Sequence, residues 1–152
     1  MGVENMQINL ANTQLFRGME PSDIDEMLGC LMAKERTYKK GEIILQEGTI
    51  TEQIGVVLSG MVIIELGDVW GNNSVLSSID PGGVFAEAYA CVPGEPLMVN
   101  VTAAGDTKVL LLNIGRVLEP CSKACPYHMR LVRNLLTLCA GKNLQLSRRV
   151  LH

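Results

Sequence analysis

Two cysteines and a histidine near the end of the chain have a spacing that could hold a metal ion. Cys121, Cys125 and His128 follow the pattern Cys-x3-Cys-x2-His, and thiolate and imidazole groups together bind zinc, iron or a haem. Cys91 or Cys30 would then add a fourth ligand or sense oxidants. The spacing matches no standard zinc finger, and cysteine is also a common buried hydrophobe. We therefore assign no metal site and keep these three residues as an alternative.

One carboxylate, Glu87, lies in a segment that is bounded by turn signals. A turn signal at 81–83, a run of small residues, a second turn signal at 92–94 and an apolar run follow one another. From Gly41 to Thr107 there are nine acidic residues and no Lys or Arg, whereas eight Lys or Arg and one acid follow from Lys108 to His152. A buried anion needs a paired cation or several donors. The segment therefore disfavours an anionic ligand. Two alternatives stay open for Glu87: it receives a hydrogen bond from a hydroxyl or amine of another ligand, or it is an exposed or capped carboxylate.

The sequence lacks the residue sets of common active sites. Its two histidines, His128 and His152, both lie in the C-terminal region, away from the predicted strands. It has no nucleophile–base pair and no glycine-rich phosphate loop. We expect a protein that is not an enzyme.

The elements that would position these residues are mostly short strands. Apolar runs between glycines, spaced as in an all-β sandwich or barrel, are 43–45, 54–58, 61–66, 75–79, 97–101 and 109–112. Asn12 or Thr13 is expected to cap a helical turn that ends near Gly18. Ser22 is expected to cap the short helix that follows it. The run 84–91 predicts one or two helical turns, and 114–119 another short helix.

A long helix is predicted from Pro126 to His152, with Cys125 as its cap. A heptad seam with two polar positions is formed by Val132, Leu135, Cys139, Lys142, Leu146 and Arg149, which predicts a homodimer. A second stripe, expected to pack on the strands, is Met129, Leu131, Leu136 and Leu138. The alternative is a single broad face packed on its own domain.

Four stretches resemble the cyclic-nucleotide-binding domains of Crp/Fnr-family bacterial transcription regulators. Residues 40–48 and 57–62 resemble the paired turns of the family's β-helix, and Phe85-Ala86-Glu87-Ala88 stands where the family has Phe-Gly-Glu. Residues 96–101 stand where it has Pro-Arg-Ser/Thr-Ala-x-Val; one departure is Gly55, where a large residue is usual. The resemblance implies a mainly β fold with helices: a double-stranded β-helix, that is, a jelly-roll or cupin-like barrel. Short N-terminal helices and a long C-terminal dimerisation helix would flank it.

The resemblance also implies a ligand site. Leu97 and Met98 replace the family's phosphate-binding Arg and Ser/Thr, so we expect an effector other than cyclic AMP or GMP, with an apolar wall that suits a small apolar or aromatic molecule. The implied contacts are Phe85, Ala86, Glu87, Ala88, Leu97, Met98 and Val99, with Lys142 and Asn143 reaching the ligand across the dimer. Alternatively, Lys142 points to solvent and only sets the helix register.

The resemblance sets the expected organisation and function. Residues 1–124 would form the sensor domain and 125–152 the dimerisation helix. The helix-turn-helix that follows in the family is absent, so we expect a truncated regulator that contacts DNA only through that domain. Two alternatives remain: a thiol or metal redox sensor that uses Cys121, Cys125 and His128, or a ligand-free interaction module. In the module, Leu97 and Met98 would fill the pocket; a closed apolar pocket would favour it and an open one containing Glu87 would oppose it.

The amino-acid composition indicates what kind of core the protein has and in which compartment it is found. Of 152 residues, 47% are hydrophobic and 4% aromatic, so the core must be mostly aliphatic. A mean hydropathy of +0.21 indicates apolar surface that a partner covers. The sequence has no apolar run long enough for a membrane span and no secretory signal. Five cysteines without a signal favour a reducing compartment, so we expect a cytoplasmic protein.

Overall fold

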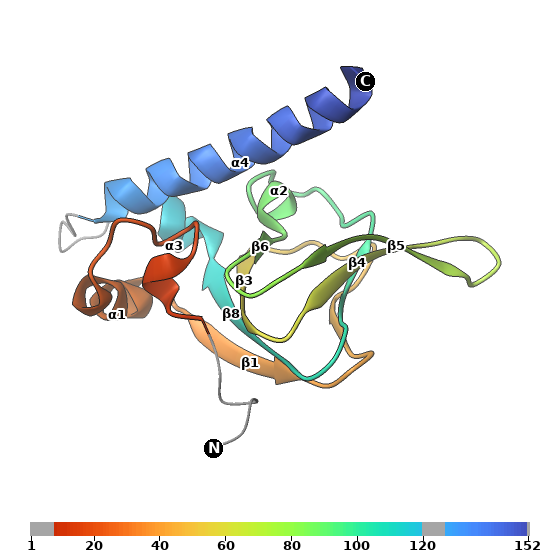
Figure 1. Cartoon of the computed structure of the whole chain (residues 1–152), viewed down its shortest axis with the longest axis horizontal. Helices are drawn as coiled ribbons and strands as arrows, with labels where there is room; N and C mark the ends of the chain where they lie inside the picture. The colour runs from red at the N-terminus through yellow and green to blue at the C-terminus, as the bar shows by residue number, and fades with distance from the viewer. Residues whose placement is uncertain (1–7, 120–126, 152) are drawn as a thin grey trace.

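The structure is a computed structural model that describes residues 8–119 and 127–151. It is mainly β, with helices at both ends of the chain (Figure 1). The strands are β1 (Lys34–Tyr38), β2 (Ile43–Leu45), β3 (Gln53–Ser59), β4 (Val62–Gly67), β5 (Asn73–Ile79), β6 (Val84–Phe85), β7 (Asn100–Ala103) and β8 (Thr107–Asn113). The helices are η2 (Leu10–Asn12), α1 (Pro21–Cys30), α2 (Glu87–Ala90), α3 (Ile114–Leu118) and α4 (His128–Leu151).

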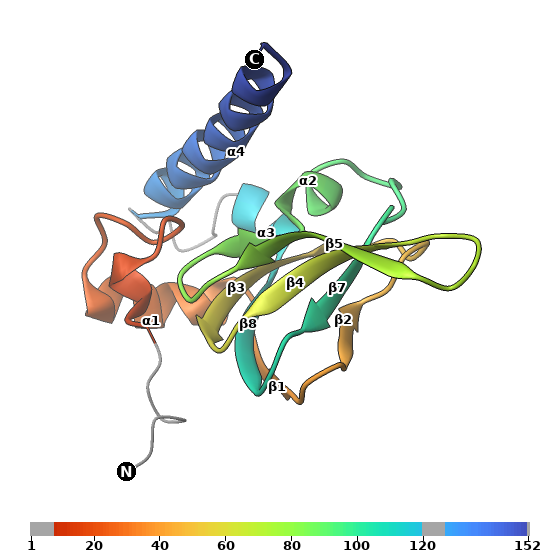
Figure 2. The same cartoon turned by 45° about the vertical axis from the view of Figure 1, so that its right-hand side comes forward.

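The strands form two four-stranded antiparallel sheets. One has the order β1-β8-β3-β6 and the other β2-β7-β4-β5, and Figure 2 shows β3 and β8 at the back with β4 and β7 in front. This confirms a mainly β, jelly-roll-like fold with a C-terminal helix. The prediction of a closed barrel is wrong for the described residues, because no strand pairing joins the two sheets there.

Two apolar clusters hold the layers together. One lies between the sheets and includes Val57, Val62, Phe85, Leu97 and Val101. The other lies between the outer face of the first sheet and the helices. Strand β3 is therefore buried on both faces, from Ile54 to Leu58, which explains why its sequence is a continuous apolar run rather than an alternating one.

Two strands that the sequence did not predict complete the first sheet. Strand β1 has four exposed residues and lacks an apolar pattern, yet it pairs along its length with β8, from Lys34 opposite Leu111 to Tyr38 opposite Thr107. The two-residue strand β6 pairs with β3. The strand predicted at 97–101 begins instead at Asn100, because the backbone of Leu97 bonds to the turn at Gly48 and Thr49.

The caps of the N-terminal helices differ from the prediction. The Thr13 hydroxyl accepts a hydrogen bond from the Phe16 amide at 3.3 Å, but residues 14–18 form a turn rather than a helix. The helix that forms here, η2, is capped by Asn9, and Thr13 follows its end. The prediction for Ser22 is wrong, because α1 already begins at Pro21, after Glu20. Proline fits the first helical position, since its missing N–H would have no helical partner there.

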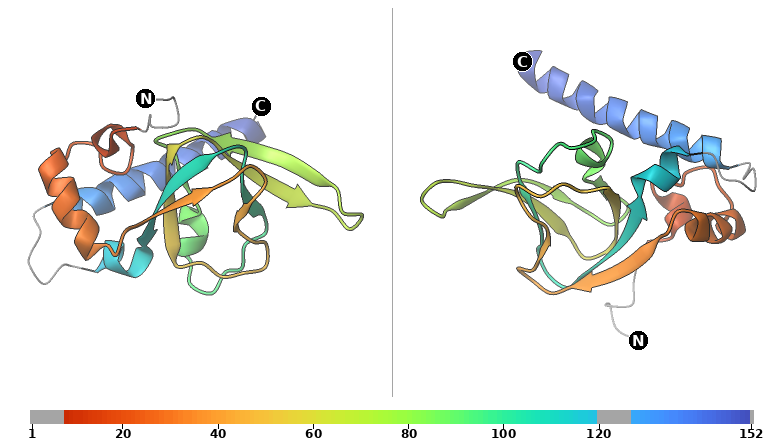
Figure 3. Two further views of the ribbon diagram at one scale, coloured as in Figure 1. Left: turned by 90° about the horizontal axis from the view of Figure 1, so that it is seen from below. Right: turned by 180° about the vertical axis from the view of Figure 1, so that it is seen from behind.

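Helix α4 runs along one side of the domain and its C-terminal end points away from the sheets (Figures 1 and 3). Leu131 and Leu138 are buried, as expected, but Met129 and Leu136 are 66% and 65% exposed. The second stripe is thus wrong for those two residues, which lie on the outer side of the helix. Leu135, predicted for the dimer seam, is 3% exposed and belongs to the domain's own core.

No helix of the described part of the chain is long and apolar enough to cross a membrane.

Candidate ligand pocket

The segment that carries Glu87 is shaped by its turn residues. Gly82, in the first turn, has a φ of +92°, a conformation that glycine adopts without strain. Residues 84–85 then pair with β3, so the predicted helical run at 84–91 shortens to the single turn of α2. Ala86 joins the two with a φ of 67° and a ψ of 8°. A left-handed alanine is strained, and it stands where the resembling family has glycine.

A partly buried ion pair joins α2 to α4. Lys142 Nζ lies 2.5 Å from Glu87 Oε1 and also donates to the Val84 carbonyl at 2.8 Å. The side chain of Glu87 is 9% exposed and that of Lys142 is 40% exposed. The pairing explains how an acidic group is tolerated inside the fold. Lys142 reaches this site within its own chain, whereas the sequence predicted a contact across the dimer.

A pocket of about 200 Å³ opens beside this ion pair. Of the residues predicted to contact a ligand, it brings together Phe85, Ala86, Glu87, Ala88, Val99 and Lys142. It also includes residues that sequence reasoning missed: Ile64, Ser77, Ile79, Tyr89 and Val101. The spacing of Ser77 and Ile79 was a usable signal, because both lie in β5 and residues two apart lie on one face of a strand.

Three predicted contacts lie outside this pocket. Leu97 is 2% exposed and packs in the cluster between the sheets. Met98 is 63% exposed, and its amide donates to the Tyr89 hydroxyl at 3.4 Å. Asn143 is exposed on α4. The expected apolar wall of Leu97, Met98 and Val99 is thus reduced to Val99, and Leu97 and Met98 do not fill the cavity.

The fit of Phe85 against Gly55 shapes the back of this region. A Cβ added to Gly55 would lie 2.0 Å from Cζ of the Phe85 ring, and the two residues face each other across β3 and β6. The large side chain that the family usually has at Gly55 would therefore collide with this ring. Gly55, which departs from the family pattern, therefore leaves the space that the Phe85 ring occupies.

Two free cysteines lie near the ion pair. Burial raises the pKa of the Cys91 thiol, and the neighbouring Cys139 and Glu87 raise it further. Burial and Glu87 likewise raise the pKa of Cys139, while Lys142 lowers it. Because the thiolate is the reactive form, both side chains are weak nucleophiles at neutral pH.

The predicted alternative metal set lies only partly within the described residues. Cys121 and Cys125 fall outside them, as does the expected cap role of Cys125. His128 is 9% exposed, its Nε2 lies 2.5 Å from the Val117 carbonyl oxygen, and its Nδ1 has no partner among the described residues. In the described part of the chain, no three His, Cys, Asp or Glu side chains are grouped to hold a metal ion.

The fold and this pocket define a known class. Residues 35–123 match the family described as the cyclic nucleotide-binding domain, so the chain belongs to that family. It is 27% identical over 103 residues, 68% of its length, to the cyclic AMP receptor protein of Thermus thermophilus, of which it covers 46%. The resemblance to Crp/Fnr regulators is thereby confirmed.

Solved structures share the fold. The catabolite activator protein of Thermus thermophilus has a TM-score of 0.71 at 24% identity, over 91% of this chain and 62% of that one. The sensor domain of the transcriptional regulator DNR from Pseudomonas aeruginosa has a TM-score of 0.65 at 18% identity, over 93% of this chain and 85% of that one. The chain thus spans about half the length of the curated relative and most of a separate sensor domain.

Proposed function

We propose that the chain is the effector-sensing domain of a Crp/Fnr-type transcription regulator, and that its effector is not a cyclic nucleotide. The observation that carries this proposal is the ion pair between Lys142 and Glu87. Among the described residues that line the pocket, Lys142 is the single cation and Glu87 the single carboxylate, and they are paired. A cyclic phosphate entering there would have to break that pair and lie beside an unpaired carboxylate, which is costly in a buried site.

The size and polarity of the pocket narrow the effector further. Its volume of about 200 Å³ is below the roughly 300–1,000 Å³ of sites for drug-sized ligands. Ile64, Ile79 and Val99 supply apolar walls, while Ser77 and Glu87 offer hydrogen-bonding groups. These features support a small, largely apolar effector with a hydroxyl or amine group that donates a hydrogen bond to Glu87.

Signal transmission would use α4, since it carries Lys142. An effector changes a regulator only through its different affinities for two conformations. A ligand that accepts a hydrogen bond from Lys142, or that displaces Lys142 from Glu87, would alter how the C-terminal half of α4 is held. In the full regulator that helix would connect a homodimer to a DNA-binding domain.

The outer side of α4 supports the homodimer. Its exposed apolar residues are Met129, Leu136 and Leu146, and half-buried Val132 and Cys139 border them. Leu135 and Lys142, both predicted for the seam, are already engaged within the chain. The proposed dimer surface is therefore turned outward relative to the predicted seam.

Native mass spectrometry of the purified chain, followed by denaturing spectra and metal analysis, tests the proposal. We expect a dimer that carries a small organic mass. Ala88→Phe, which narrows the pocket, should remove this mass, whereas Val92→Phe, at an exposed position that does not line it, should not. Calorimetric titration with cyclic AMP and cyclic GMP should give no binding. Tight binding of either nucleotide would refute the proposal, and stoichiometric zinc or iron would favour the alternative with Cys121, Cys125 and His128.

A further inference from the structure

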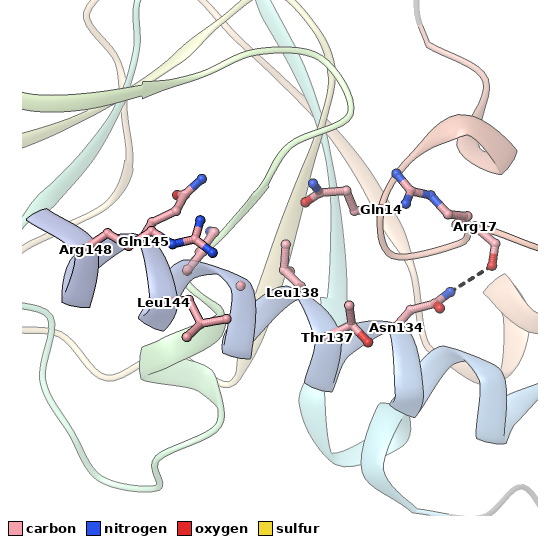
Figure 4. A pocket seen from close by; sticks show the side chains of 10 residues that line it. Gln14, Arg17, Asn134, Thr137, Leu138, Leu144, Gln145 and Arg148 are labelled. Atoms are coloured by element: carbon pink, nitrogen blue, oxygen red, sulfur yellow. Dashed lines mark hydrogen bonds between the residues drawn. The ribbon is translucent and has the colours of Figure 1, made fainter.

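A second and larger cavity lies on the other flank of α4. It is a groove of about 600 Å³ between α4 and the segment that follows η2, lined by ten residues that include Gln14, Arg17, Asn134, Gln145 and Arg148 (Figure 4). This volume is within the roughly 300–1,000 Å³ range of small-molecule sites. Nothing in the family resemblance assigns a role to this groove.

The walls of this groove are held in place by the fold. Asn134 Nδ2 donates to the carbonyl oxygens of Leu15 and Arg17 at 2.8 Å and 3.0 Å, which ties the N-terminal segment to α4. Leu15 and Phe16 of that segment are fully buried, and Leu138 lines the groove at 7% exposed. The groove is therefore a fixed feature of the packing between these two elements.

The groove has the opposite charge to the rest of the sensor domain. Arg17, Lys142 and Arg148 contribute three cations to its lining, and no Asp or Glu is among the ten lining residues. Gln14, Asn134 and Gln145 add side-chain amides that can donate hydrogen bonds. In Figure 4, Arg17 and Arg148 lie toward opposite ends of the group of side chains. Guanidinium groups bind carboxylate and phosphoryl oxygens with paired hydrogen bonds.

We propose that this groove binds a small, multiply charged anion with carboxylate or phosphoryl groups at both ends, held by Arg17 and Arg148. The central part of the anion lies over Leu138 and Gly141, beside the amides of Asn134 and Gln145. This site is separate from the pocket at Glu87 and does not depend on the effector proposed there.

Lys142 connects the two sites. It is the one residue that lines both the groove and the pocket, and its ammonium group is paired with Glu87. An anion in the groove competes with Glu87 for this ammonium group. Binding of the anion therefore weakens the tie between α2 and α4, and strengthening that tie weakens anion binding by the same factor, because such coupling is reciprocal.

The groove stays accessible in the proposed dimer. Each of its residues Asn134, Gly141 and Arg148 comes two positions after Val132, Cys139 or Leu146, which border the proposed dimer surface. Two positions on an α-helix correspond to ~160° around its axis. The groove and the dimer surface are thus on opposite sides of α4.

Isothermal titration of the full chain with tripolyphosphate and with citrate, at constant ionic strength in potassium chloride, tests this site. We expect saturable binding of one anion per chain. Arg17→Gln and Arg148→Gln should each weaken it about tenfold, because each removes a charge-assisted hydrogen bond. Arg36→Gln, which removes an equal charge from exposed strand β1 outside the groove, should leave the affinity unchanged. Binding of tripolyphosphate alone assigns a phosphoryl ligand, and binding of citrate alone a carboxylate ligand.

Glu87→Gln tests the coupling. It removes the carboxylate that competes for Lys142, which keeps its bond to the Val84 carbonyl, and Glu87 does not line the groove. Anion affinity should therefore rise about fivefold or more. The site is refuted if neither probe binds saturably, or if Arg36→Gln weakens binding as much as Arg148→Gln does. An unchanged affinity in Glu87→Gln would overturn the competition for Lys142. Circular dichroism melts of the arginine variants, whose side chains are exposed, separate loss of binding from loss of folding.

Discussion

Glu87 and Lys142 are 55 residues apart in the sequence, and their charged groups are 2.5 Å apart in the structure. Through this contact the turn of α2 holds the helix that the family resemblance places between sensor and output. The same lysine lines both the pocket at Glu87 and the basic groove. Under the two proposals above, the position of α4 depends on what occupies either cavity.

Lys142→Met is expected to lower the free energy of unfolding by about 1–3 kcal/mol, because it leaves the Glu87 carboxylate buried without its partner. The effect stays below that of a fully buried pair, since the Lys142 side chain is 40% exposed. Urea denaturation measures it. The double variant Glu87→Gln/Lys142→Met should regain part of the loss, and strict additivity of the two single effects would contradict a direct interaction.

Gly55→Ala should destabilise the fold by about 1–3 kcal/mol, as overpacking of a core does, because the added Cβ collides with the Phe85 ring. Phe85→Leu in the same chain should recover part of this loss. Gly29→Ala is the control: it lies in α1 with nothing within 4 Å of the added Cβ, and should stabilise by about 1 kcal/mol. Equal effects at both glycines would argue against the ring contact.

Ala86→Gly should raise stability by about 1 kcal/mol, because glycine adopts the left-handed conformation without a Cβ clash. Ala88→Gly, inside the helical turn of α2, should instead lower stability by about 1 kcal/mol. Thermal unfolding of the two variants gives opposite shifts in Tm. A loss of stability in Ala86→Gly would show that this residue carries no backbone strain.

The raised pKa values of Cys91 and Cys139 predict a dependence of stability on alkaline pH. Folding holds both thiols protonated above their ordinary value of 9.0, so their contribution is complete below that pH and is lost as pH rises through the folded pKa values. Urea midpoints between pH 8 and pH 11 measure this loss. The variant Cys91→Ala/Cys139→Ala should show a smaller decline, and an identical decline would exclude these thiols as its source.

The homodimer predicts that Leu136→Glu shifts the chain toward monomer, since it places a charge in an apolar contact. Sedimentation velocity at micromolar concentration measures the change. Leu118→Glu makes the same substitution at another exposed site, in α3, and should leave the dimer intact. A wild-type monomer under these conditions would rule out the proposed surface.

Local pattern was sufficient for most elements of the fold. Glycine-punctuated apolar runs predicted β2, β3, β4, β5 and β8 within a few residues, because side-chain periodicity and turn chemistry are local properties. The exposed strand β1 was not predictable in this way, because its conformation depends on pairing with β8, far along the chain.

The candidate site was predictable to the extent that its residues are contiguous. The run Phe85 to Ala88 identified one wall of the pocket. The register of the family resemblance along the long helix supplied Lys142, although as a contact across the dimer. Tertiary structure alone decided the rest. Leu97 was taken up by the core between the sheets, Leu135 by the core under α4, and Ser77 and Val101 were brought to the pocket from separate strands. Periodicity identifies which residues share a face of a strand or helix, but only packing in three dimensions determines what that face contacts.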